Sequence, residues 1–131
     1  MSIRVVRAGV LTSVQDPGRY GLQHLGIVPG GAMDLVSHTI ANALVGNPAQ
    51  AATLECTVLG PSLLVEHDAL VALYGAEFDA KADALPLPCN RPVLIKAGTR
   101  LSIGAATRGA RAYLAVAGGF QVPVVLGVPS A

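Results

Sequence analysis

Short aliphatic segments recur along most of the chain, divided by glycine, proline and charged residues. Such a series of short apolar runs with turn residues between them is typical of a β-barrel or β-sandwich. Three prolines fall between residues 85 and 92, where they would remove strand hydrogen bonds, so we expect a loop there. We predict strands at residues 3–8, 53–59, 62–67, 69–74, 77–84, 93–95, 100–103 and 110–117.

One segment, beginning at Asp34, has the spacing of an α-helix instead. Asp34 is a favoured N-cap, and Gly46 and Pro48 are typical of a helix end. The apolar residues that fall on one side are Leu35, Val36, Ile40, Ala43 and Leu44. Asp34, His38 and Asn42 recur every four residues on a different face. We expect that face to be the solvated one, with Asn42 bonded to a neighbouring loop.

These patterns predict one domain over residues 1–131 that is mainly β with one inserted α-helix. Between the first strand and the helix, residues 13–34 combine many glycines with reactive side chains. His24 can act as a general acid or base near neutral pH, and Asp16 can orient it if the segment folds back. The alternative is a histidine that bonds backbone carbonyls and stiffens the loop. Arg19 can clamp a carboxylate or phosphate through two parallel hydrogen bonds, or simply pair with Asp16.

Two further features are weaker signals of a site. Gly30 and Gly31 precede the helix, where free backbone amides favour an anion. The lysine and the Ser/Thr of a phosphate loop are absent, so a structural turn is the alternative. Glu55 interrupts an apolar strand, and its carboxylate needs either solvent or a partner. A buried pair with Arg19 would supply that partner.

Composition limits the classes of function. The chain has 131 residues, of which 52% are hydrophobic and 13% charged, with a formal net charge of +1. This charge gives no electrostatic reason to expect nucleic acid or an anionic membrane as a partner. No apolar stretch is free enough of breakers to span a membrane, and the N-terminus lacks a signal-peptide pattern. We therefore expect a cytoplasmic protein.

The two cysteines, Cys56 and Cys89, are far apart and lack the spacing of a metal site. We expect reduced, structural thiols, with a disulfide or a reactive role as the alternatives. The sequence also lacks a Gly-x-Ser-x-Gly elbow and a His-Glu-x-x-His pair. These patterns predict no metal centre and no known hydrolase site.

Several motifs, in order along essentially the whole chain, resemble one family. They comprise Ser13, Gln15, Asp16, Gly18, Arg19, Gly21, His24, Gly26, Gly31 to Asp34, Ala41, Asn42, Leu44 to Asn47, Leu54, Glu55, Thr57, Gly60, Pro61, Arg108, Gly109, Arg111 to Val116, Gly118, Gly119, Val122, Pro123 and Val125 to Gly127. The sequence is similar to the carboxyltransferase-domain family, also called allophanate hydrolase subunit 2. That family includes the KipA-type proteins and the C subunit of bacterial 5-oxoprolinase.

The resemblance implies a cyclophilin-like β-barrel and a partner of the KipI or allophanate hydrolase subunit 1 type. Members of the family transfer a carboxyl group from carboxybiotin to urea, open 5-oxoproline to glutamate at the expense of ATP, or control a sporulation kinase. We expect a subunit of an ATP-dependent amidohydrolase or carboxyltransferase-type complex, with 5-oxoproline favoured, that is inactive without its partner subunit. A KipA-like regulator without turnover and biotin-dependent carboxyl transfer to urea are the alternatives.

The resemblance also implies roles for particular residues. These systems share a small amide, ureide or lactam with a carboxylate or phosphate nearby. We expect Arg19 to hold the anion, His24 to transfer a proton at the amide nitrogen, and Asp16 to fix either of them. Substrate or anion contacts are expected from Gln15, Gly30, Gly31, Asn42 and Glu55. We expect no cofactor on this chain itself, and ATP, or biotin, at the level of the complex.

Two features depart from the family pattern. Thr39 stands where many relatives have arginine, which removes a charge contact. After Gly127 the family continues with a Ser-Arg-Ser-Thr stretch and a second half, whereas this sequence reads Val128, Pro129, Ser130 and Ala131. The resemblance therefore implies the N-terminal half of a longer domain. Because a partial barrel has open strand edges, we expect association with a second copy or with the complement, a lactam-hydrolase subunit being a further partner.

Overall fold

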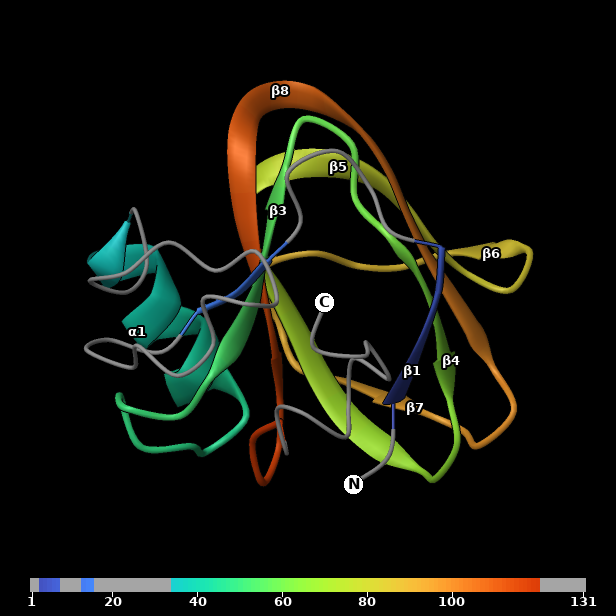
Figure 1. Cartoon of the computed structure of the whole chain (residues 1–131), viewed down its shortest axis with the longest axis horizontal. Coiled ribbons are helices and arrows are strands. Elements are labelled where there is room, and N and C mark those ends of the chain that lie inside the picture. Colours follow the sequence, from blue (N-terminus) through green and yellow to red (C-terminus); the bar gives the residue numbers. More distant parts are fainter. Residues whose placement is uncertain (1–2, 8–12, 16–33, 121–131) are drawn as a thin grey trace, which may run out of the picture.

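The computed structural model describes residues 3–7, 13–15 and 34–120. This part of the chain holds one helix, α1 (Leu35–Leu44), and one eight-stranded sheet (Figure 1). In chain order the strands are β1 (Ile3–Arg7), β2 (Ser13–Gln15), β3 (Thr53–Thr57), β4 (Ser62–Val65), β5 (Ala69–Ala82), β6 (Leu85–Pro86), β7 (Val93–Ile95) and β8 (Arg100–Val116). No helix of this part has both the length and the apolar character needed to cross a bilayer.

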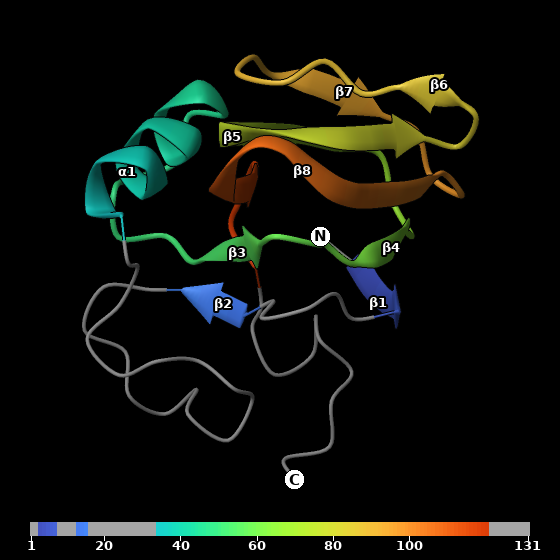
Figure 2. The same ribbon diagram turned by 90° about the horizontal axis from the view of Figure 1, so that it is seen from above.

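The sheet is organised around β5 and β8, its two longest strands. One edge of β8 pairs antiparallel with β5 along most of its length. The other edge pairs with β4 and, further along, with β3, which carry β1 and β2 on their far sides. β6 and β7 both pair with β5. Within the described residues, β1 and β2 therefore lie at the two ends of an open path (Figure 2).

β5 and β8 bend where glycine lets their backbones approach closely. The register between the two strands shifts in the stretch from Gly75 to Ala80. Gly75 has a φ of +129°, and a Cβ there would lie 2.8 Å from the carbonyl oxygen of Arg111. A Cβ on Gly104 would lie 2.5 Å from the carbonyl oxygen of Asp79. Bulges and glycines of this kind curve a sheet without ending its strands.

The predicted fold class is confirmed, because the described residues form a mainly β structure with one helix and an open, partial barrel. The predicted division of the chain into strands was wrong: β2 was not predicted, and two pairs of predicted strands are single strands in the structure. The strands predicted at 69–74 and 77–84 fall in one strand, β5, and those predicted at 100–103 and 110–117 fall in β8. The glycines that indicate turns in the sequence lie at bends within continuous strands.

The predicted loop at residues 85–92 was also not entirely correct, since it begins with β6. Its two residues pair only with the end of β5, at Lys81 and Ala82. Pro86 is tolerated there because a short strand at a sheet edge does not need every backbone donor.

Side-chain alternation along the strands separates two apolar clusters. The larger cluster lies inside the curved sheet and includes Leu54, Leu73 and Leu114. The smaller cluster lies between the sheet and α1 and comprises Ala41, Val45, Ala72, Tyr113 and Ala115. Because successive residues of a strand point to opposite faces, every second residue in this part of β3, β5 and β8 faces α1. Polar side chains gather on that face.

Candidate functional site

Asp34 caps the N-terminus of α1, as the sequence predicts. Its carboxylate accepts hydrogen bonds from the Ser37 amide at 3.0 Å and the Ser37 hydroxyl at 2.7 Å. These bonds hold the pKa of Asp34 below its ordinary value, with a smaller contribution from the charge of Arg111. The Asp34 amide donates to the hydroxyl oxygen of Tyr113 at 2.8 Å. The start of the helix is thereby tied to β8.

The face of α1 that packs against the sheet is partly polar. His38 and Asn42 are fully buried beside Ala41, whereas Leu35 and Val36 are 54% and 69% exposed. The expectation that His38 and Asn42 lie on a solvated face is therefore wrong. Both side chains can be buried because β3 and the loop after the helix supply hydrogen-bond partners for them.

Hydrogen bonds hold both ring nitrogens of His38. Its Nε2 lies 3.0 Å from the Ala49 carbonyl oxygen, which can only accept, so Nε2 carries the proton. Its Nδ1 lies 2.8 Å from Thr53 Oγ1. The imidazole meets the ring of Tyr113 edge-on, with centroids 6.2 Å apart and planes at 84°. His38 thus supports Tyr113 from the helix side.

Asn42 and Asn47 hold the loop between α1 and β3 against β8. The Asn42 amide nitrogen donates to the Ala51 carbonyl oxygen at 2.8 Å, and Asn42 Oδ1 accepts from Asn47 Nδ2 at 3.2 Å. Asn47 also donates to the Val116 carbonyl oxygen at 2.7 Å and accepts from the Gly118 amide at 2.9 Å. These bonds give Asn42 a structural role, and its predicted contact with a substrate stays a prediction.

Glu55 lies on the α1-facing side of the sheet, between Leu54 and Cys56, which face the core, and it is only 4% exposed. Tyr113 is its register partner on β8, and the Tyr113 hydroxyl donates to Glu55 Oε2. Burial, and then this hydrogen bond, raises the pKa of Tyr113 well above its usual value, so the phenol remains a donor. A continuous chain of hydrogen bonds therefore runs from Asp34 through Tyr113 to Glu55.

Arg111 lies on the same face of β8, two residues before Tyr113. Its Nε is 3.9 Å from Glu55 Oε2, which makes an ion pair but not a hydrogen bond. The Arg111 side chain is 36% exposed and that of Glu55 5%. We name Asp34, Glu55, Arg111 and Tyr113 the Glu55 cluster; it is covered on the Tyr113 side and reaches the surface at Arg111.

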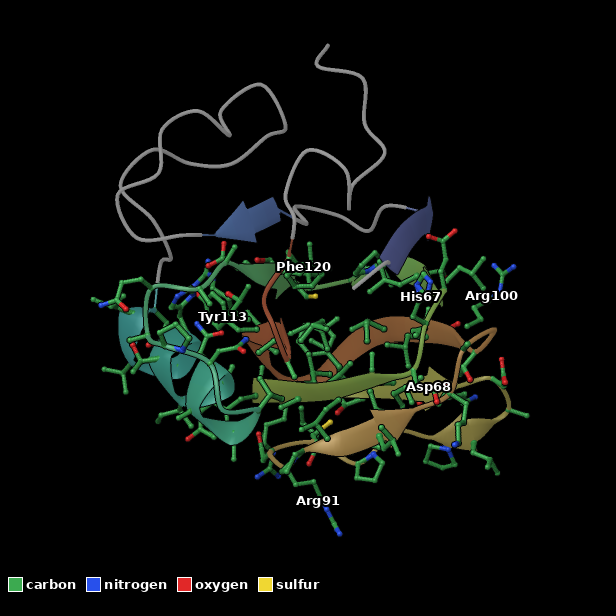
Figure 3. All side chains as sticks on the ribbon, turned by 90° about the horizontal axis from the view of Figure 1, so that it is seen from below. His67, Asp68, Arg91, Arg100, Tyr113 and Phe120 are labelled. Atoms are coloured by element: carbon green, nitrogen blue, oxygen red, sulfur yellow. The ribbon has the colours of Figure 1, made fainter. Side chains whose placement is uncertain are left out.

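The Glu55 cluster occupies one end of the molecule. Figure 3 shows Tyr113 beside α1, and His67, Asp68 and Arg100 at the opposite end of the sheet. At that far end Lys96 and Asp68 form an ion pair at 3.9 Å, and both of its side chains are mostly exposed. Exposed ion pairs of this kind contribute little, so the buried charges at Glu55 are the better candidate for a site.

The described residues on either side of positions 16–33 lie at the Glu55 cluster. β2 pairs with β3 so that Ser13 is the register partner of Glu55 and Gln15 that of Thr53. At the other end, Asp34 is bonded to Tyr113. The predicted site residues within this segment are Asp16, Arg19, His24, Gly30 and Gly31. All five lie outside the described residues, so their roles, and a pair between Arg19 and Glu55, stay predictions.

The sequence reasoning missed Tyr113 and Arg111 as site residues. Strand alternation places both on one face of residues 110–117, as it places Glu55 on one face of its own strand. Recognising that the two faces coincide requires the register Glu55↔Tyr113, which joins residues 58 positions apart. Only the family motifs, which contain all three residues, carried a signal.

The described residues contain no group of three or more His, Cys, Asp and Glu side chains placed to hold a metal ion. Both cysteines are free thiols, as predicted. Cys56 is fully buried, and burial raises its pKa from an ordinary value of 9.0 to about 12. Cys89 is only partly buried, and burial raises its pKa as well. Since the thiolate is the reactive form, Cys56 is protected from reagents both by its burial and by its raised pKa.

We expect a disulfide reagent to modify Cys89 first and Cys56 only when the chain unfolds. The test follows the absorbance of released thiolate in wild type and in Cys89→Ser, with guanidinium-unfolded protein as the reference. Fast reaction of native Cys89→Ser would contradict the buried position of Cys56.

Cys56 also predicts a dependence of stability on alkaline pH. The thiol ionises near pH 9.0 when unfolded but near 12 when folded. Its contribution to stability is therefore complete below about pH 9 and is lost as the pH rises from there towards 12. The free energy of unfolding of Cys56→Ala should fall less steeply over that range, which urea titrations at a series of pH values would measure.

Residues 25–131 match the family described as carboxyltransferase domain, subdomain A and B. The C subunit of 5-oxoprolinase from Escherichia coli is 42% identical over 125 residues, which are 95% of this chain and 40% of that protein. A putative urea carboxylase of Emericella nidulans is 47% identical over 121 residues, which are 91% of this chain and 10% of that protein. The crystal structure of the K. lactis urea amidolyase superposes with a TM-score of 0.82 at 39% identity, covering 93% of this chain and 7% of that one.

The chain thus spans less than half the length of each of these relatives. The family match nevertheless covers most of the chain, as does the superposition. The resemblance drawn from the motifs is confirmed: this chain belongs to the carboxyltransferase-domain family.

Proposed function

We propose that this chain is a subunit of an ATP-dependent amidohydrolase or carboxyltransferase-type complex that acts on a small lactam or ureide, with 5-oxoproline to glutamate favoured. The identity with the C subunit of 5-oxoprolinase, over nearly the whole chain, supports this choice. The observation that carries the proposal is the Glu55 cluster. A carboxylate, a phenol and a guanidinium meet there, next to β2 and to the start of α1, the described elements on either side of positions 16–33.

The chemistry of these groups suits an amide substrate. Glu55 can accept a proton or an N–H, and the Tyr113 hydroxyl and the charge of Arg111 fix where the carboxylate lies. In the proposed site, His24 transfers a proton at the amide nitrogen and Arg19 holds the anionic group of the substrate, with Asp16 orienting one of them. Gln15, next to Thr53 in register, and Gly30 and Gly31 complete the proposed substrate contacts.

Carboxyl transfer to urea is the second candidate, because the similar proteins include a urea carboxylase and a urea amidolyase. Both candidates place an amide-type substrate beside Glu55. They differ in the second reactant, which would come from other parts of the complex. The two are separated by supplying 5-oxoproline or urea to the same preparation.

We further propose that activity requires partner subunits of the KipI and lactam-hydrolase types, and that the isolated chain associates with itself. In the described part, β1 pairs only with β4 and β7 only with β5, so each leaves one strand edge open. Leu94 of β7 is 61% exposed beside one of these edges. Open apolar edges favour strand pairing between chains. A cooperatively unfolding monomer at micromolar concentration would rule out self-association.

The experiment is to co-purify the chain with the partner subunits and assay ATP-dependent release of glutamate from 5-oxoproline. We expect turnover by the complex and none by the chain alone. His24→Ala should lower turnover by about 100-fold, and Arg19→Ala should raise KM. The matched controls are His67→Ala and Arg108→Ala, which change exposed side chains.

Unchanged turnover in both His24→Ala and Arg19→Ala would leave those residues a structural role only. Turnover of urea with bicarbonate and ATP, but not of 5-oxoproline, would replace the favoured reaction by carboxyl transfer. A co-purified complex that turns over neither compound would contradict the proposed function and favour a regulatory protein.

A further inference from the structure

Arg111 has a hydrogen-bond donor, Nε, that the described part of the chain does not use. Its side chain is largely covered, and Nε is buried without a hydrogen-bond partner among the described residues. The nearest carboxylate oxygen, Glu55 Oε2, is 3.9 Å away, beyond hydrogen-bonding distance. A guanidinium carries five N–H donors, and buried donors in folded proteins are nearly always paired. An acceptor from outside this part of the chain is therefore required.

The charges around Arg111 limit what that acceptor can be. Glu55 Oε2 lies 3.9 Å from the guanidinium Nε. Among the described residues, the Glu55 carboxylate thus already faces this positive charge. A further full negative charge beside Arg111 would be repelled by that carboxylate, whereas a neutral carbonyl oxygen can accept from the guanidinium without that repulsion. The surroundings favour an amide or urea oxygen over a carboxylate or phosphate.

Glu55 adds a second requirement for the ligand. Because its carboxylate is an acceptor beside this donor, the ligand must also offer a donor. The register pairs Glu55↔Tyr113 and Thr57↔Arg111 hold the Glu55 and Arg111 side chains on one face of adjacent strands. A carboxylate can accept about four hydrogen bonds, so the bond from Tyr113 leaves it able to accept others. The site therefore offers a donor and an acceptor next to each other.

We propose that Arg111 and Glu55 bind one edge of a cis amide, Arg111 donating to the carbonyl oxygen and Glu55 accepting from the N–H. Lactams and ureas present both groups on the same side, whereas a trans peptide bond presents them on opposite sides. The pair therefore selects a lactam or ureide edge against an ordinary peptide bond, and against a carboxylate or phosphate group placed at Arg111. The ligand class rests on the proposed function, whereas the donor and acceptor roles rest on the contacts of Arg111.

The test uses small probes and the full 131-residue chain. The arginine Nε–H and backbone amide NMR signals are followed during titration with 2-pyrrolidinone, N-methyl-2-pyrrolidinone and acetate. We expect 2-pyrrolidinone to shift the signals of Arg111 and of residues around Glu55. N-methyl-2-pyrrolidinone keeps the carbonyl but lacks the N–H, so it should bind about tenfold more weakly. Acetate should leave these signals in place.

Two arginine variants separate this site from general surface effects. Arg111→Gln should weaken 2-pyrrolidinone binding by about tenfold or more, because a charged donor is lost. Arg108→Gln, an exposed position on the same strand, should bind as wild type. The probe series on wild type needs no variant, so poor folding of Arg111→Gln would not leave the proposal untested.

Three results would overturn the inference: acetate shifting Arg111 more than 2-pyrrolidinone, equal binding of the two lactams, or wild-type binding by folded Arg111→Gln. The assay of the assembled complex is independent of these titrations. A complex that turns over 5-oxoproline with wild-type kinetics after Arg111→Gln would contradict this inference and still support the proposed function. Arg111-dependent lactam binding in a complex that turns over neither substrate would support this inference and contradict the proposed function.

Discussion

Tyr113→Phe is expected to lower the free energy of unfolding by about 3 kcal/mol, because one hydroxyl bonds both the Asp34 amide and the buried Glu55 carboxylate. The Tyr113 oxygen accepts from the Asp34 amide at 2.8 Å, and its proton is donated to Glu55. Phenylalanine fills the same space but leaves the amide without an acceptor and the buried carboxylate without its donor. Unfolding in urea, followed by circular dichroism, measures the loss.

The matched control is Tyr74→Phe. Tyr74 is the register partner of Tyr113 on β5 and is only partly buried, and its hydroxyl makes no hydrogen bond within the described part of the structure. Removing that hydroxyl should change stability by no more than about 0.5 kcal/mol. Equal losses in the two variants would mean that the hydrogen bonds of Tyr113 contribute nothing beyond those of an ordinary surface phenol.

Glu55→Gln is expected to lower turnover of the assembled complex by about 100-fold while the chain remains folded. Glutamine keeps the shape of the side chain and an oxygen that accepts from Tyr113, so the structural part of the cluster is retained. It removes the negative charge that pairs with Arg111 and the capacity to take a proton. Initial rates of ATP-dependent glutamate release from 5-oxoproline measure the effect.

Glu77→Gln serves as the control for charge alone. Glu77 is exposed on β5, its carboxylate accepts from the Thr107 hydroxyl, and its register partner is Arg108, which is not a member of the Glu55 cluster. It should turn over 5-oxoproline at the wild-type rate. Wild-type turnover in Glu55→Gln as well would show that the carboxylate has only a structural role.

Local signals in the sequence predicted local structure correctly. The cap at Asp34 and the end of the helix near Gly46 depend on residues within a few positions of each other, and the structure has α1 between them. Glu55 could be singled out because a carboxylate in an apolar strand must find a partner. Its described partners, Tyr113 and Arg111, could not be identified, since they come from a strand whose register with β3 no local pattern specifies.

Predictions were wrong where tertiary contacts determine the exposure or the backbone conformation of a residue. His38 and Asn42 were expected on a solvated face because polar side chains are usually exposed. In the interior, however, His38 is hydrogen-bonded to Thr53 and to the Ala49 carbonyl. Asn42 is hydrogen-bonded to the Ala51 carbonyl. Strands were predicted to end at residue 74 and begin again at 77, but Gly75 lies at a bend where β5 approaches β8 closely. In both cases the partner lies on another element, and the sequence alone does not reveal it.

A double-mutant cycle on turnover tests most directly whether Glu55 and Tyr113 act as one functional unit. Wild type, Glu55→Gln, Tyr113→Phe and the double variant are each assembled with the partner subunits and assayed with 5-oxoproline. If the Tyr113 hydroxyl acts through Glu55, the double variant should turn over about as slowly as Glu55→Gln alone. A double variant whose loss equals the product of the two single losses, or single variants with no loss, would contradict the assignment of this cluster as the site.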